Sequence, residues 1–173
     1  MVLMTKKAPN FQIVPIFNQN AQGIWRGFLD VEIACDSKIY KLDPPCAAVM
    51  KNRLRGYKSN LDDYKHNFAF AAYSQKRIIG FAHGYAIDTN EAYLHHLYVL
   101  PQYHKCGIGT KLLQATEQAC SMFATKLSLV ALVEAVPFYE QKQGYDGPGR
   151  NKEKELRPRP TLLYPYFNGL KKI

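Results

Sequence analysis

The segment 91–123 constrains the fold of this chain most strongly. An extended stretch at about 92–99 is followed by a turn that carries Pro101, Gly107 and Gly109. The N–H groups at the start of a helix have no partner within the helix, and glycine lets an anion approach them closely. The segment therefore predicts a strand, a glycine turn and a helix around a phosphate-sized anion. Apolar residues recur at the helical period at Ile108, Leu112, Ala115, Ala119 and Met122.

The preceding part of the chain predicts two helices and three strands. Phe11–Phe17 is expected to be an edge strand because Pro15 cannot donate to a central ladder. A helix is expected at 23–34. A second helix begins at Asp43-Pro44-Pro45, where a capping carboxylate precedes proline. Strands at 67–73 and 77–87 then form a hairpin that leads into the central strand.

The second hairpin strand, at 77–87, alternates with a period of two. The larger side chains are expected on one face and the small ones on the other, so another element should pack closely against the small face. The first face would hold Ile79, Phe81, His83, Tyr85 and Ile87, and the second Ile78, Gly80, Ala82, Gly84 and Ala86.

Beyond the central helix, the pattern predicts a strand at 126–131 and a helix at 134–143 that stops at Gly144. A polar loop is expected at 147–159, and a last edge strand at 161–167, which contains Pro165. The order of these elements indicates a mixed α/β fold. With 173 residues, the chain is expected to be a single domain over 1–173.

Composition limits the classes of partner. The net charge of +9 attracts anions, but no aromatic-interleaved RNA motif accompanies it, so we do not expect a nucleic-acid partner. The four cysteines show no CxxC spacing, which gives no support to a zinc site. Apolar runs are too short to span a bilayer, and the first residues are too short for a signal-peptide core. A cytoplasmic protein without membrane contact is expected.

Two blocks resemble the GNAT superfamily of acyl-CoA-dependent N-acetyltransferases. Residues 97–109 resemble its V-x-P-x-x-[Q/R]-x-x-G-x-G motif, and residues 135–145 resemble its A-x-x-F-Y-x-x-x-G-[F/Y] block. The resemblance implies a GNAT-like mixed, mostly antiparallel central sheet flanked by helices, with CoA at a splayed central strand. It also implies acetyl-CoA as co-substrate and a small-molecule or protein amine as acceptor. Homodimerisation stays open.

The resemblance assigns cofactor contacts residue by residue. The pantetheine arm would lie along Leu97, Tyr98 and Val99, and Phe138 would lie beside the thiol. His104 stands where the family has Gln or Arg, and Glu134 falls near a position where many relatives have asparagine. The diphosphate would bind the loop amides of Lys105, Cys106, Gly107, Ile108, Gly109 and Thr110.

The candidate catalytic residues are Tyr139, His95 and His96. Tyr139 matches the family residue that donates a hydrogen bond or proton to the departing sulfur. His95 and His96 are candidate bases, since an amine must lose a proton; a water relay is the alternative. As neighbours on a strand they are expected to face opposite sides, with His95 on the side of Tyr93, Leu97 and Val99.

Other polar residues admit less specific interpretations. His83 is expected to join one of the two histidines by packing, and no metal is expected because no ligand spacing such as H-x-x-E-H is present. Asp88 and Glu91 either act through water, attract a cationic amine or are solvated turn carboxylates. The acceptor pocket is expected between the first two helices, with Trp25, Tyr40, Tyr57 and Tyr64 as lining or core residues.

Three functions remain open from the sequence. The first is acetyl transfer from acetyl-CoA to a primary amine by direct attack in a ternary complex. The second is the same chemistry on an aminoacyl-tRNA, which the positive charge would suit. The third is a non-catalytic acyl-CoA-binding regulator, which would bind acetyl-CoA without turnover.

Overall fold

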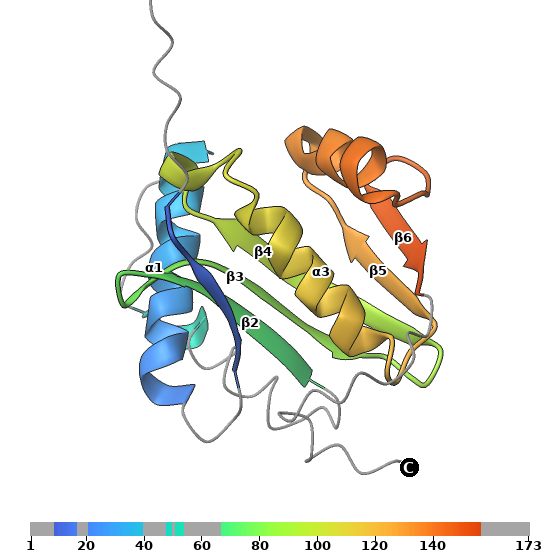
Figure 1. Cartoon of the computed structure of the whole chain (residues 1–173), viewed down its shortest axis with the longest axis horizontal. Helices are drawn as coiled ribbons and strands as arrows, with labels where there is room; N and C mark the ends of the chain where they lie inside the picture. The colour runs from blue at the N-terminus through green and yellow to red at the C-terminus, as the bar shows by residue number, and fades with distance from the viewer. Residues whose placement is uncertain (1–8, 17–20, 40–47, 50, 54–66, 157–173) are drawn as a thin grey trace, which may run out of the picture.

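A six-stranded sheet forms the centre of the protein (Figure 1). The computed structural model describes residues 9–16, 21–39, 48–49, 51–53 and 67–156. The strands follow one another across the sheet in chain order: β1 (Gln12–Pro15), β2 (Asn67–Ser74), β3 (Arg77–Ala86), β4 (Glu91–Val99), β5 (Lys126–Val130) and β6 (Asn151–Glu155). Every neighbouring pair is antiparallel except β4 and β5, which are parallel. The expected mixed, mostly antiparallel sheet is therefore confirmed.

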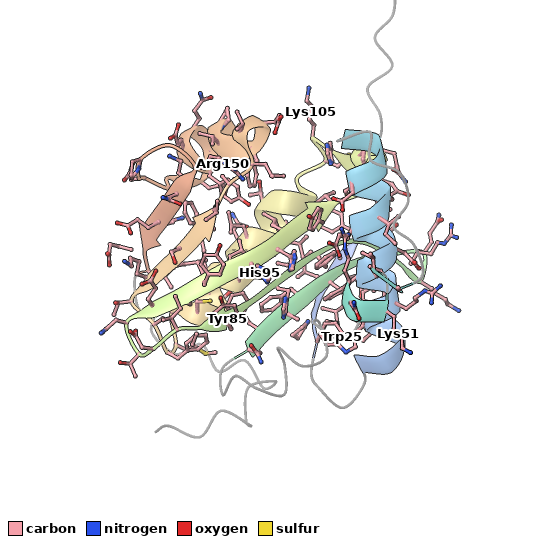
Figure 2. The ribbon with its side chains drawn as sticks, turned by 180° about the vertical axis from the view of Figure 1, so that it is seen from behind. Trp25, Lys51, Tyr85, His95, Lys105 and Arg150 are labelled. Carbon is pink, nitrogen blue, oxygen red and sulfur yellow. The ribbon has the colours of Figure 1, made fainter. Side chains whose placement is uncertain are left out.

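Helices α1 (Ala21–Ile39) and α3 (Ile108–Cys120) cover opposite faces of this sheet (Figures 1 and 2). The core beneath α3 contains Leu112, Leu127 and Tyr145, whereas Trp25, Phe28 and Phe81 belong to a separate core beneath α1. The predicted helix at 23–34 is confirmed and is longer than expected. Residues 48–49 and 51–53 are helical as predicted, and the remainder of that second helix lies outside the described residues. No helix in the described part of the chain is both long and apolar enough to cross a membrane.

A bulge changes the expected faces of β3. The register passes from Ala72↔Gly80 to Tyr73↔Ile78, so Ile79 is an extra residue. Ile79 consequently packs in the core beneath α3, while Ile78 packs beneath α1. The prediction that Ile79 shares a face with Phe81 was wrong because the alternation is interrupted at this point.

The close packing expected on the small-residue face of β3 is present. A Cβ atom on Gly80 would lie 2.8 Å from the Tyr98 carbonyl oxygen and 3.3 Å from Cδ1 of Leu112 on α3. A larger residue at this position would push α3 away from the sheet. The helix itself follows the predicted apolar pattern except at Met122, which lies beyond the helix end and is exposed.

The region after β5 differs most from expectation. The helix predicted at 134–143 is present but irregular: it begins as a 3₁₀ turn, η3 (Val133–Ala135), and continues into a π-helical segment, η4 (Phe138–Lys142). It stops at Gly144, whose φ is +68°. The polar loop predicted at 147–159 was wrong, because residues 151–155 form β6. The predicted strand at 161–167 lies outside the described residues.

Candidate active site

Strand β4 divides into two halves. Its first residues, 91–94, pair with β5 from Glu91↔Lys126 to Leu94↔Leu129. Within the described residues, 95–99 pair with β3 only, from His96↔His83 to Val99↔Gly80. Figure 1 shows β4 and β5 side by side at one end and diverging at the other. Main-chain groups on the β5 side of the second half therefore have no sheet partner there, as the expected splayed strand requires.

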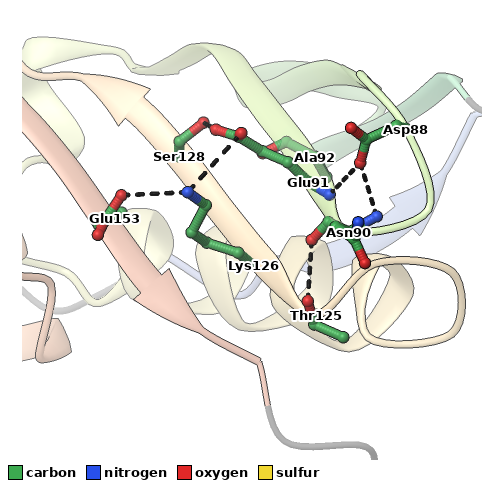
Figure 3. A network of polar contacts seen from close by, with 8 residues as sticks. All are labelled: Asp88, Asn90, Glu91, Ala92, Thr125, Lys126, Ser128 and Glu153. Atoms are coloured by element: carbon green, nitrogen blue, oxygen red, sulfur yellow. Dashed lines mark hydrogen bonds and ion pairs between the residues drawn. The ribbon is translucent and has the colours of Figure 1, made fainter.

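A polar network holds the first half of β4 against β5 (Figure 3). Ser128 Oγ donates a hydrogen bond of 2.5 Å to Glu91 Oε1, and Lys126 Nζ lies 3.7 Å from Glu91 Oε2 and 3.3 Å from Glu153 Oε2. Asp88 Oδ1 accepts the N–H groups of Asn90 and Glu91 at 2.7 and 2.9 Å. Asp88 and Glu91 thus have structural partners in the turn and at the paired end of the strand.

The loop after β4 leads into the start of α3. Lys105 and Gly107 both have left-handed backbone, with φ of 64° and 80°. The N–H of Lys111 donates to the Gly107 carbonyl at 3.0 Å, which begins the α3 ladder. The amides before it belong to the helix start, where the backbone dipole favours an anion. The start of α3 is thus a helix N-terminus of the kind that favours an anion, and diphosphate binding by this loop stays a prediction.

The side chain of His104 ties this loop to the end of β4. Its Nε2 lies 2.7 Å from the Val99 carbonyl oxygen, which also accepts a hydrogen bond from Cys35 Sγ at 3.3 Å. Cys106 Sγ is 3.7 Å from the His104 carbonyl and packs on the core beneath α3. In this structure His104 holds the loop in place through the main chain of the strand.

The two sequence blocks meet in space. Phe138 from the second block lies on Gly109 from the first: a Cβ atom added to Gly109 would be 3.6 Å from Cζ of Phe138 and 3.8 Å from Cγ2 of Val99. Gln143 Nε2 also donates to Thr110 Oγ1 at 3.1 Å. The loop at 105–110, called the phosphate loop below, therefore lies together with the end of β4 and the η4 segment.

The second block contains one residue more than the motif it resembles. Four residues separate Tyr139 from Gly144, where the motif has three. The π-helical winding of η4 absorbs one extra residue without ending the helix.

The side chain of Tyr139 is buried. Its ring centroid lies 5.0 Å from that of Phe138 and 5.6 Å from that of Tyr145. Burial raises the pKa of Tyr139, so the phenol stays protonated and can donate a hydrogen bond.

A bulge in β4 places His95 and His96 on the same face. The register with β3 passes from His83↔His96 to Gly84↔Leu94, which makes His95 the extra residue. The ring centroids of His95 and His96 are 4.1 Å apart, and those of His83 and His96 are 5.9 Å apart. The prediction of opposite faces was wrong because it assumed an unbroken strand. His95 does share its face with Tyr93, as expected, but Leu97 and Val99 pack beneath α3.

The three histidines lie on the face that α1 covers. Trp25 of α1 has its ring 6.3 Å from that of His83, and Figure 2 shows His95 and Tyr85 on this side of the sheet. His83 is fully buried, while the side chain of His95 is exposed. Burial lowers the pKa of His83 to about 4 and that of His96 to about 3, and partial burial lowers the pKa of His95. His83 and His96 are therefore neutral imidazoles at neutral pH.

Trp25 is the one residue expected at the acceptor pocket that the structure describes. It is 4% exposed and packs on Phe28 and His83, so it belongs to the core and also reaches the histidines. Tyr40, Tyr57 and Tyr64 lie outside the described residues.

The sequence analysis assigned no contact to Arg53. In the structure Arg53 lies next to α1 and donates to Glu32 Oε1 at 3.0 Å and to Asp36 Oδ2 at 3.1 Å. No local pattern links these three residues.

Comparison with solved structures finds the same fold. The PaiA N-acetyltransferase from Thermoplasma acidophilum, in complex with coenzyme A, has a TM-score of 0.58 and 19% identity over 84% of this chain and 99% of its own. An acetyltransferase of the GNAT family from Staphylococcus aureus Mu50 has a TM-score of 0.67 and 17% identity over 86% of this chain and 100% of its own. An aminoglycoside 6'-acetyltransferase type Ii has a TM-score of 0.65 and 18% identity over 86% and 99%.

The search among curated protein sequences found no match. The family model described as "Acetyltransferase (GNAT) family" matches residues 37–145, more than half of the chain. This range contains β4, the phosphate loop, α3 and the η4 segment. The chain therefore belongs to the GNAT acetyltransferase family, which confirms the expectation of a GNAT-type acetyltransferase with acetyl-CoA as co-substrate.

Proposed function

We propose that this protein transfers an acetyl group from acetyl-CoA to a primary amine by direct attack in a ternary complex. The observation that carries the proposal is the division of β4. The edge of its second half that does not pair with β5 runs between two features, the amides at the start of α3 and the histidines on the α1 face. A cofactor along this edge would have its diphosphate at one feature and its thioester near the other.

The proposed contacts with acetyl-CoA are made by main-chain groups of β4 and of the phosphate loop. The edge at Leu97, Tyr98 and Val99 would hold the pantetheine arm, and the amides of 105–110 would hold the diphosphate. Phe138 forms an apolar wall where it lies on Gly109. The residues present fit the co-substrate because the edge of β4 that does not pair with β5 leads, through the loop, to the N–H groups at the start of α3.

His95 is proposed as the base. It is the exposed member of the histidine group and is reachable by an acceptor that approaches from the α1 side. The lone pair of the amine forms the bond to the acetyl carbon while the C–S bond breaks, and the amine proton moves to the His95 imidazole. His96 is less exposed, and it is proposed to orient His95, since the two ring centroids are 4.1 Å apart with the rings tilted by 44°.

Tyr139 is proposed to donate a hydrogen bond to the departing sulfur. The raised pKa makes full proton transfer to a thiolate less favourable, so the role is donation with the proton retained. This step predicts that Tyr139→Phe slows turnover and leaves acetyl-CoA binding intact.

The test is a panel of primary amines with thiol release as the readout, run beside thermal stabilisation by acetyl-CoA. Stabilisation together with turnover of at least one amine supports the proposal. The control is Tyr145→Phe, which removes a neighbouring buried hydroxyl that is given no role at the sulfur. Absence of acetyl-CoA stabilisation would overturn the proposal.

One observation favours the non-catalytic alternative, an acyl-CoA-binding regulator. Tyr139 is 7% exposed and packs on Tyr145, and the segment that carries it contains an extra residue. Were the hydroxyl turned into this core, the sulfur would lack its donor. Binding of acetyl-CoA without turnover of any amine, with Tyr139→Phe indistinguishable from the native protein, would select this function.

A further inference from the structure

Three histidines from two strands converge on the α1 face. His83 on β3 and His95 and His96 on β4 each offer a ring nitrogen, and these nitrogens all lie within 4.8 Å of one another. No other group of three or more histidine, cysteine or carboxylate side chains with this proximity occurs in the described part of the chain. The strand pairing and the bulge at His95 bring the three histidines together. Because the grouping depends on pairing between strands, the sequence contains no metal-ligand spacing that would predict it.

The distances suit a small transition-metal ion after a minor adjustment. Zinc binds imidazole nitrogen at 2.0–2.1 Å, so two nitrogens on one tetrahedral ion lie roughly 3.3 Å apart. His83 is held by burial and by its stacking on His96. His95 is exposed, so its ring can rotate to complete the set. The exposed side also leaves a fourth position for water.

The charge of the surroundings is compatible with a divalent cation. His83 is fully buried and His96 is half-buried, and burial favours the neutral imidazole, which is the form that binds metal. The fixed positive charge of Arg53 acts on His96. Arg53 is paired with both Glu32 and Asp36, so its charge is compensated. Three imidazoles without a carboxylate favour zinc over magnesium or calcium.

We propose that His83, His95 and His96 form a binding site for one Zn²⁺ ion, with the fourth position open to water. A bound ion would take the lone pair of His95. On the proposed function, which assigns the base to that lone pair, zinc would therefore inhibit acetyl transfer. The ion-binding claim itself needs no turnover and can be tested separately.

The experiment uses the full chain after chelator treatment and dialysis. Zn²⁺ is titrated by calorimetry, and Co²⁺ is added as a spectroscopic probe of the coordination geometry. We expect one equivalent of Zn²⁺ and a visible Co²⁺ absorption of the tetrahedral type. In His95→Ala the zinc affinity should fall at least tenfold. His104→Gln is the matched control, because it removes an exposed histidine outside the group and should bind zinc as the native protein does.

Two results would overturn the site. One is the absence of zinc binding to the native protein, and the other is unchanged affinity in His95→Ala. Because His95 is exposed, this variant is expected to fold, and its melting temperature without metal checks that. His96→Ala provides the second variant and should lose zinc affinity to a similar extent. Acetyl-transfer assays with and without zinc then test inhibition, and their outcome leaves the binding result unaffected.

Discussion

The two halves of β4 differ in what surrounds them. The first half, 91–94, is paired on both sides and is fixed by a hydroxyl and a lysine that both contact Glu91. The second half, 95–99, is paired on one side, carries the bulge and leads into the phosphate loop. The same strand therefore provides a fixed support in its first half and, directly after it, an edge that is available to a ligand. Substitutions in the two halves should therefore affect different quantities.

The largest expected effect is on activity and comes from the second half. A positioned base contributes roughly 10²–10⁴-fold to rate, so His95→Ala should lower kcat/KM by at least a hundredfold. The melting temperature should stay close to that of the native protein, since the side chain is exposed. The measurement is thiol release with chelator present. A loss of less than tenfold would remove His95 from the base role and favour a water relay.

A change at the start of α3 should act on cofactor affinity. In Gly109→Ala the added Cβ atom meets Phe138 at 3.6 Å, an ordinary contact, so this variant should behave nearly as the native protein. In Gly109→Val the further methyl groups crowd Phe138 and the loop amides, and KM for acetyl-CoA should rise about tenfold. Gly23→Val is the control in another helix, because a Cβ atom there meets nothing within 4 Å. Equal KM values for the Ala and Val variants would contradict this account of the loop.

A change in the first half should act on stability. Ser128→Ala removes the hydrogen bond to Glu91, and such a bond to a partly exposed carboxylate contributes about 1 kcal/mol to the free energy of unfolding. Urea denaturation should show this loss, while kcat/KM stays within about twofold. A large loss of activity without a loss of stability would show that the paired half also takes part in catalysis.

The smallest expected effect comes from replacing two lysines that have the same backbone conformation, only one of which lies in the phosphate loop. Lys105 in the phosphate loop and Lys76 in the β2–β3 turn both have φ of 64°. Replacing either with glycine should change the free energy of unfolding by less than about 1 kcal/mol, because relief of left-handed strain is offset by a more flexible unfolded chain. Lys105→Gly should also weaken acetyl-CoA binding roughly three- to fivefold through loss of a surface charge. Calorimetry should show no such loss in Lys76→Gly, and an equal loss in both would disprove a local role of Lys105.

The part of the candidate site that can be predicted is the part that depends on the local sequence pattern. The strand, the glycine turn and the helix beginning at Ile108 follow from period and from glycine positions, and all three are present. The bulge at His95 is not predictable in this way, because it depends on which β3 residue pairs with His96. Strand β6 was missed for a similar reason: four of its five residues are charged, and pairing with β5 determines its conformation.

The buried lysine of β6 illustrates the same limit. Lys152 is 2% exposed, and its ammonium group lies 2.7 Å from Glu140 Oε1 on η4 and also donates to the Gly147 carbonyl. Lysine is rarely buried without a partner, so a sequence rule places it on the surface. Its partner comes from another element twelve positions earlier in the chain, and the pairing becomes visible only in the fold.

The bulge in β4 also changes how much chemistry a short strand can present. In a regular strand every second side chain faces a given side, which gives three on one face in any six residues. Here Tyr93, His95, His96 and Tyr98 follow one another on the α1 side, with ring centroids 6.2, 4.1 and 5.9 Å apart. One inserted residue thus raises the density of polar rings at the centre of the sheet. Deleting it would restore the alternation and reduce that density, while the fold on either side could remain unchanged.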